Sequence, residues 1–303
     1  MLARTLWVLT LIRLVVVVLI AYGLHAGAGW PLAPSIIVAV LVPLLGHLAI
    51  LGSQFLLARW SASPVPPRFA IGPAGWLRVF AEEARVSLVS FTVRQPLLGS
   101  RPVASAAAPG AADRLPVLFV HGFFCNRAVW RPMARVLARR GHVTASVNLE
   151  PVFGSIDAYV DVIERGIRDL QRRTGDEQVA LVCHSMGGLA ARAYLRARGI
   201  DDVARVVTIG SPHRGSVHSR FGLATNVRQM RRDSDWLAGL ARTEWPSVRR
   251  LFTIVLSHHD NIVAPQAIQT LPDATTIELG AVGHMAMLER APVHELVARL
   301  LVR

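Results

Sequence analysis

Ser185 stands where a nucleophilic serine would be placed. It follows an apolar run, residues 178–184, and precedes a helical pattern, with the small residues Cys183 and Gly187 two positions to either side. A nucleophilic serine needs a tight strand-to-helix turn that lifts its hydroxyl above the sheet, and the turn crowds those two flanking positions. Cys183 departs from the usual glycine but is also small. We therefore predict that Ser185 is the nucleophile, that Gly187 permits the turn, and that His184 supports it.

A carboxylate and a histidine follow the last two apolar runs. Asp260 comes soon after residues 251–257, and His284 lies in a glycine-bracketed loop after residues 274–280. A carboxylate at a strand end can hold an imidazole in the tautomer that activates a serine. We predict His284 as the general base and Asp260 as the acid that orients it. Asp273 is the alternative acid, although it precedes a strand rather than following one.

The loop after the first apolar run can supply the remaining part of an acyl-transfer site. His121 and Gly122 stand at the end of that run, residues 116–121. Acyl transfer creates an oxyanion, which is stabilised by backbone donors preset in a loop. Gly122 permits the unusual backbone, with His121 as part of the same motif. The N–H groups of Phe123 and Met186 are the predicted donors.

No metal ion or cofactor is predicted. His258 and His259 are adjacent, and neighbouring residues on a strand point to opposite faces, so we expect structural roles for both. Asp233 and Asp235 lie in an arginine-rich segment and make a weak cation site. The chemistry expected above needs side chains and backbone donors only.

From residue 116 onward, short apolar runs alternate with amphipathic helical stretches. The runs are residues 116–121, 142–149, 178–184, 204–210, 251–257 and 274–280, and the helical patterns are residues 128–140, 155–173, 187–198 and 285–301. This alternation indicates a mostly parallel sheet with helices on both faces. The insertion at about 211–250 carries apolar residues at helical spacing, which favours a cap or lid over the site. An ordinary core-packed helix is the alternative.

The first 60 residues predict two transmembrane helices, at about 5–22 and 32–57. The second run is uncharged over more residues than the ~20 that a spanning helix needs. The first contains Arg13, which can snorkel or pair. A cleaved signal peptide ending near Ala26–Ala28 is the alternative for the first run. Arginines precede the first run and follow the second, so we expect both ends of the membrane segment, and the domain that follows it, in the cytoplasm.

Residues 61–114 are interpreted as a linker. Prolines after the second apolar run break any continuing helix, the β-branched segment 86–93 could form a strand, and residues 99–113 are small and proline-rich, typical of a flexible connection. The formal charge is +13, but every basic residue is an arginine and none are massed in one stripe. We therefore expect attraction to anionic lipid rather than nucleic-acid binding.

The motifs VHGFF, CHSMGG, IGSPHRGS, HHDNIVAP and AVGH resemble those of the bacterial lipase and esterase branch of the α/β-hydrolases, over about 115–303. The resemblance implies an α/β-hydrolase fold and acyl-ester hydrolysis through an acyl-enzyme without a cofactor. It does not extend to residues 1–114. With the apolar runs, it predicts an enzyme of the bacterial inner membrane that cleaves lipid or long-acyl esters. An acyltransferase using the same residues and a non-catalytic membrane scaffold are the alternatives.

Overall fold

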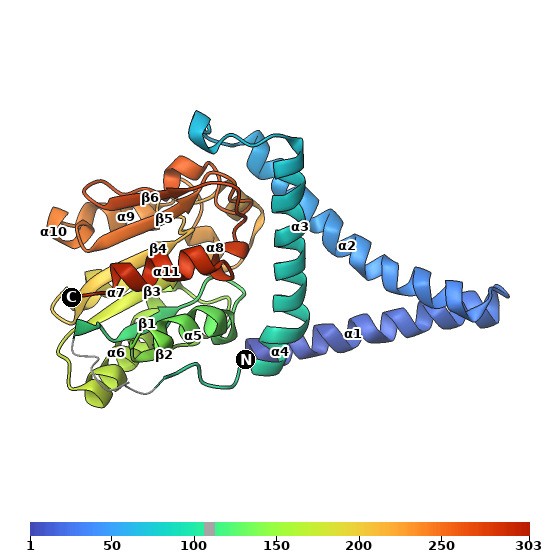
Figure 1. Ribbon diagram of the computed structural model, residues 1–303, viewed down its shortest axis with the longest axis horizontal. Helices are drawn as coiled ribbons and strands as arrows, with labels where there is room; N and C mark the ends of the chain where they lie inside the picture. Colours follow the sequence, from blue (N-terminus) through green and yellow to red (C-terminus); the bar gives the residue numbers. More distant parts are fainter. Residues whose placement is uncertain (106–112) are drawn as a thin grey trace.

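A computed structural model describes residues 1–105 and 113–303 (Figure 1). Residues 106–112, within the connection predicted to be flexible (residues 99–113), therefore lie outside the described residues. The helices and strands from residue 115 onward form a layered domain, and the first hundred residues pack against one end of it.

Six parallel strands form one sheet in the order β2-β1-β3-β4-β5-β6. They are β1 (Val117–Val120), β2 (Thr144–Ser146), β3 (Val179–His184), β4 (Val203–Ile209), β5 (Phe252–Ser257) and β6 (Thr275–Leu279). The six predicted runs are thus confirmed as strands. The chain moves outward from β1 to β2 and then returns to β3, so the loops after β1 and β3 meet at a topological switch point, where such sheets place their sites.

Helices cover both faces of the sheet, as the alternating pattern predicted. They are α5 (Arg131–Arg139), α6 (Val160–Thr174), α7 (Met186–Arg198) and α11 (Ala291–Leu300). Alternate side chains of β1 enter different cores: Leu118 packs with residues of α6 and α7, and Phe119 packs with residues of α5 and α11. This alternation follows from the two-residue period of a strand. It makes the sheet a rigid base for the loops at its carboxyl edge.

The insertion between β4 and β5 carries three short helices, α8 (Thr225–Gln229), α9 (Asp235–Thr243) and α10 (Pro246–Arg249). Leu240 of α9 is fully buried in the core beside α7. Arg192 of α7 donates two hydrogen bonds, of 2.6 and 2.7 Å, to the buried carboxylate of Glu244 just after α9. By contrast, Phe221 and Leu223 are 70% and 82% exposed. Leu240 and Glu244 therefore belong to the packed interior, whereas Phe221 and Leu223 present apolar side chains outward.

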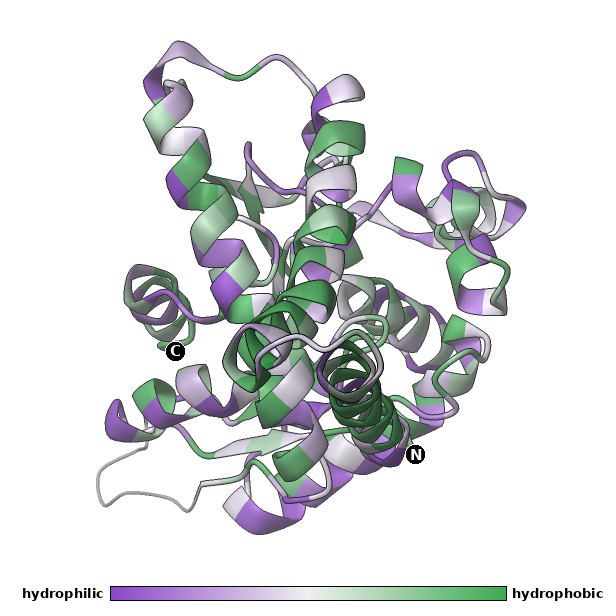
Figure 2. Ribbon diagram, turned by 90° about the vertical axis from the view of Figure 1, so that its right-hand side faces the viewer, coloured by the Kyte–Doolittle hydropathy of each residue, from purple (hydrophilic) through white to green (hydrophobic). Residues whose placement is uncertain are grey.

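The two apolar runs form a helical hairpin, α1 (Leu2–Tyr22) and α2 (Leu32–Trp60), joined through a π-helical turn at Gly23–Gly27. Both are long and apolar enough to cross a membrane, and only 6% and 17% of their most apolar windows are buried. The hairpin projects from the domain as a V with its tip far from the sheet (Figure 1), and its surface is strongly hydrophobic (Figure 2). Helices so little buried are not core helices of the hydrolase domain.

The predicted strand at residues 86–93 is wrong. This segment is helical, belonging to α3 (Pro73–Val89) and to a π-helical turn (Ser90–Arg94) that leads into α4 (Gln95–Leu98). Val79, Glu83 and Val86 are buried at helical spacing on one side of α3, which stands between the hairpin and the sheet (Figure 1). Burial of this face decides the structure, since tertiary packing overrides the strand preference of β-branched residues.

Candidate active site

Ser185 lies at a strained turn between β3 and α7. Its backbone has φ 54° and ψ −128°, a positive φ that residues other than glycine seldom adopt. Such a conformation costs on the order of 1–3 kcal/mol and persists where its surroundings enforce it. A Cβ at Gly187 would lie 2.3 Å from the carbonyl oxygen of Val120, so only glycine fits there. This is the strand-turn-helix geometry that raises a nucleophilic serine above a sheet.

The predicted acid and base are in direct contact. His284 Nδ1 donates to Asp260 Oδ2 at 2.9 Å, and the Asp260 side chain is fully buried. The other carboxylate oxygen accepts hydrogen bonds from the backbone N–H groups of Ile262 and Val263, both at 2.8 Å. These bonds leave His284 Nε2 as the nitrogen available to a nucleophile. The alternative acid, Asp273, instead pairs with Arg249.

The electrostatic surroundings make His284 more basic than an ordinary histidine. Burial lowers its pKa, but the charge of Asp260, the hydrogen bond to Asp260 and the charge of Glu83 together outweigh burial, so the pKa is raised above 6.5. The His284 backbone N–H also donates to Asn261 Oδ1 at 3.0 Å, which fixes the loop. The imidazole is thus both oriented and tuned toward accepting a proton.

Ser185 and His284 line the same cavity, which has a volume of about 330 Å³. Within the described part of the chain, Ser185 Oγ has no hydrogen-bond partner, and its side chain is not fully enclosed. Catalytic hydrogen bonds are commonly long in a ligand-free site and shorten when substrate binds. The arrangement brings all three predicted residues to one edge of the sheet, with the hydroxyl open to the cavity.

The loop after β1 lies against the serine as an oxyanion-binding loop must. A Cβ at Gly122 would lie 2.7 Å from the Cβ of Ser185, so glycine allows this close approach. His121 is buried and bridges the loop, its Nδ1 donating to the Gly122 carbonyl at 2.8 Å and its Nε2 accepting from the Leu149 N–H at 2.9 Å. Burial lowers the pKa of His121 to about 4, which keeps the ring neutral for both bonds. The N–H groups proposed to hold the oxyanion are those of Phe123 and Met186. These residues directly follow Gly122 and Ser185, the two residues that approach each other closely.

His184 has a more direct role than support of the turn. Its ring packs on that of His284 with centroids 4.5 Å apart, and its Nε2 donates to the His284 carbonyl at 3.2 Å. Burial, and then the charge of His284, lower its pKa well below 6.5, so the ring stays neutral. A neutral ring at this position packs against the base without opposing its protonation.

Glu83 is a site residue that the sequence analysis did not identify. It lies on α3, is 1% exposed, and its carboxylate accepts hydrogen bonds from the backbone N–H groups of Met285 (2.8 Å) and Ala286 (2.9 Å). Burial raises its pKa to about 7. A Cβ at Gly283 would lie 2.6 Å from Glu83 Oε2, which explains the glycine before the base. No local signal marks this contact, because the partners are about 200 residues apart in sequence.

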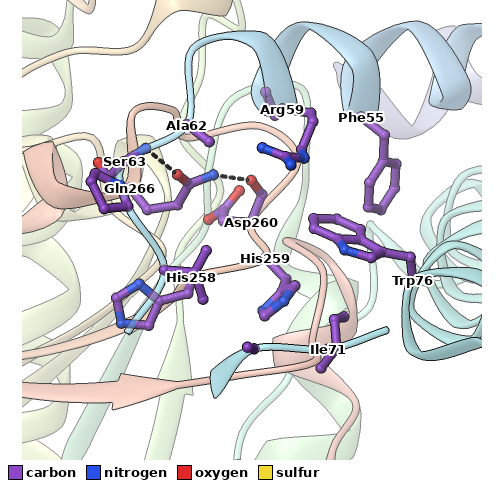
Figure 3. Close-up of a pocket in the computed structure, with 14 residues that line it drawn as sticks. Phe55, Arg59, Ala62, Ser63, Ile71, Trp76, His258, His259, Asp260 and Gln266 are labelled. Carbon is purple, nitrogen blue, oxygen red and sulfur yellow. Dashed lines mark hydrogen bonds between the residues drawn. The ribbon is translucent and has the colours of Figure 1, made fainter. Parts of the chain in front are cut away.

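The connection between α2 and α3 packs behind the acid (Figure 3). Gln266 donates to the Asp260 carbonyl at 3.0 Å and accepts from the Ser63 N–H at 3.2 Å. His259 packs on Trp76 of α3, with ring centroids 4.9 Å apart. His258 likewise stacks on Phe69, again at 4.9 Å. The adjacent histidines thus contact aromatic side chains of the N-terminal segment.

A second cavity, of about 700 Å³, also reaches Ser185. Its wall includes Phe221, Leu223 and Met230 of the insertion together with Leu57 of α2. The two cavities share Gln54, Phe123, Ser185 and Ile262. The serine therefore lies where two largely apolar spaces meet, an arrangement that can hold both halves of an ester.

Known proteins support the same assignment of fold. The family model described as alpha/beta hydrolase fold matches residues 116–243. A triacylglycerol lipase from Burkholderia plantarii is 31% identical over 59% of this chain and 51% of its own length, and one from Pseudarthrobacter phenanthrenivorans is 31% identical over 55% and 53%. The chain thus spans about half the length of these curated relatives.

A solved structure agrees with the sequence matches. The mature form of a Bacillus licheniformis lipase superposes with a TM-score of 0.60 at 18% identity, covering 67% of this chain and 97% of the lipase. At that identity, the similarity concerns the fold. The parallel sheet, the turn at the serine and these matches together show that the chain has an α/β-hydrolase fold.

Proposed function

We propose that the chain is a carboxylic ester hydrolase that acts through Ser185, His284 and Asp260. The observation that carries the proposal is the buried Asp260–His284 pair beside a serine held at a strained turn, with both serine and histidine facing one cavity. The three side chains follow one another along the chain in the order expected for this fold. The carboxylate bonded to the imidazole supports a role for His284 as the base, because it fixes the tautomer that a serine nucleophile needs.

In the proposed reaction, Ser185 Oγ attacks the acyl carbonyl while His284 Nε2 takes its proton. The N–H groups of Phe123 and Met186 stabilise the oxyanion. Collapse of the tetrahedral intermediate breaks the ester bond, and His284 gives its proton to the leaving alcohol. His284 then activates a water that hydrolyses the acyl-enzyme and regenerates the Ser185 hydroxyl. Every step uses groups of this chain and water.

Lipid or long-acyl esters are the proposed substrates. The curated relatives are named triacylglycerol lipases, and both cavities at Ser185 have largely apolar walls. We further propose that α1 and α2 span the bacterial inner membrane. The arginines before α1 and after α2 favour the cytoplasm for the hydrolase domain.

Labelling with a fluorophosphonate probe tests the function directly, because the probe reacts with activated serines. The detergent-solubilised full chain should be labelled at Ser185 and should hydrolyse p-nitrophenyl butyrate. Ser185→Ala should lose both properties while keeping the wild-type circular dichroism spectrum. A wild-type chain that is neither labelled nor active would favour the non-catalytic scaffold. Transfer of the acyl group to an added alcohol in preference to water would indicate an acyltransferase.

A further inference from the structure

The cavity that contains Ser185 and His284 continues into the helical hairpin. Its apolar wall includes Leu6 and Leu9 of α1, Ile50 and Leu51 of α2, Phe91 of the turn after α3 and Phe124 of the loop after β1. The catalytic groups form one end of the cavity, and side chains of the candidate membrane helices form the other. The hairpin is therefore part of the site as well as a membrane anchor.

The cavity follows both helices for about two turns. On α1 its lining residues run from Leu6 to Arg13, and on α2 from His47 to Gln54. At a rise of about 1.5 Å per residue, each stretch is roughly 10 Å long. The arms of the V separate toward the domain, and α3 crosses the opening (Figure 1). An elongated space of this kind suits an extended hydrocarbon chain better than a compact group.

Part of the cavity wall lies at the surface of the hairpin. Leu9 and Ile50 line it and are also 38% and 64% exposed. The surrounding surface of α1 and α2 is apolar (Figure 2). An opening through such a surface faces lipid chains if the hairpin lies in a membrane, and hydrocarbon can enter it without crossing water.

Polar groups interrupt the apolar wall. Arg13 and His47 line the cavity within the apolar runs, and His47 Nε2 lies 3.0 Å from Ser87 Oγ of α3. Ionisable residues inside membrane segments are costly and commonly mark a substrate pathway. Here they offer hydrogen bonds to the ester or hydroxyl oxygens of a molecule that is otherwise hydrocarbon.

We propose that a membrane lipid ester reaches Ser185 sideways from the bilayer, with one hydrocarbon chain lying between α1 and α2. This route rests on the hydrolase function proposed above and adds the source and the path of the substrate. In this arrangement the ester bond lies beside Ser185, where the two cavities meet. The rest of the molecule occupies the cavity beneath the insertion.

The test compares two esters in the full-length protein. Leu9→Trp and Ile50→Trp each place a large side chain at the opening of the cavity. We expect each to lower kcat/KM for trioleoylglycerol in phosphatidylcholine vesicles by about tenfold or more, since a blocked path removes productive binding. Hydrolysis of p-nitrophenyl butyrate, whose short acyl chain does not need the whole path, should fall by a much smaller factor in the same variants.

Matched controls come from the same helices. Leu11 and Leu45 are 51% and 58% exposed and lie outside this cavity, so Leu11→Trp and Leu45→Trp should leave both activities unchanged. Leu9→Ala, which widens the opening, should retain trioleoylglycerol activity. Equal losses on both esters, or equal losses in the controls, would overturn the route. A wild-type chain inactive on both esters would reject the hydrolase function itself.

Discussion

Glu83 accepts a hydrogen bond of 2.8 Å from the backbone N–H of Met285, the residue that follows the proposed base. A helix outside the sequence motifs around the proposed triad therefore holds the loop that carries His284. Because the carboxylate is buried and its charge raises the pKa of His284, Glu83 both positions and tunes the base. It acts through His284 and is a positioning residue.

Replacing Glu83 by glutamine should change the pH dependence of the reaction. His284 works as a base only when neutral, so kcat/KM should rise as pH passes its pKa, which lies above 6.5 in the native chain. Glu83→Gln removes a charge that favours the protonated imidazole, and the rise should move to lower pH. Rate profiles on a soluble ester measure this shift. Glu82→Gln removes the same charge one position away, in a pair with Arg290, and should leave the midpoint unchanged.

The stability of the chain should also respond to the Glu83 carboxyl. Burial raises its pKa from 4.5 to about 7 in the folded state, so folding favours the protonated form. The resulting stabilisation is fully present below pH 4.5 and is lost as pH rises through about 7. Between pH 5 and pH 8 the melting temperature of the wild type should therefore fall more than that of Glu83→Gln. If the melting temperatures of the two proteins in detergent instead fall by the same amount between pH 5 and pH 8, this coupling is refuted.

Asp260→Asn should lower kcat by about 10⁴-fold, because the amide no longer stabilises the imidazolium or fixes its tautomer. Its folding should be largely preserved, since the amide oxygen can still accept the bonds from Ile262 and Val263. Asp273→Asn is the matched control and should keep activity within a few-fold, because Asp273 pairs with Arg249. Steady-state kinetics on both variants would decide between the two acids, and a reversed result would reassign the role.

Gly187→Ala should damage the turn at Ser185. The added methyl would lie 2.3 Å from the Val120 carbonyl oxygen, and backbone would have to shift to accommodate it. We expect loss of fluorophosphonate labelling and destabilisation by about 1–3 kcal/mol, as for overpacked sites. In Gly239→Ala, on α9, the nearest atom to the added methyl is the flexible end of Arg242 at 3.8 Å. That variant should be neutral or slightly stabilised, because alanine favours a helix.

The sequence predicted the elements from residue 115 onward because their patterns are local. Each strand is a continuous apolar run, and Ser185 and His284 directly follow strands whose carboxyl ends must share one edge. The parallel order of the sheet then brings them together without further information. Asp260 could be chosen over Asp273 for a similar reason, because Asp260 follows a strand whereas Asp273 precedes one.

The segment between the apolar hairpin and residue 115 was harder to predict, since its structure depends on distant contacts. The β-branched residues near Val86 suggest a strand, yet the segment becomes helical because its buried face packs against the hydrolase domain. The contact of Glu83 with Met285 joins residues 202 apart in sequence, and no spacing rule indicates it. The same holds for Leu9 and Ile50, which are recognised as cavity residues only when the hairpin is seen beside Ser185.

The position of α3 bears on any attempt to obtain a soluble form of this protein. A chain shortened to begin at residue 99 would keep the three proposed triad side chains and the whole sheet. It would also leave the backbone N–H groups of Met285 and Ala286 without their acceptor. In addition, it would remove the aromatic side chains that cover the imidazole rings of His258 and His259. Low activity in such a fragment would then report a loosened histidine loop, and would say little about the native enzyme.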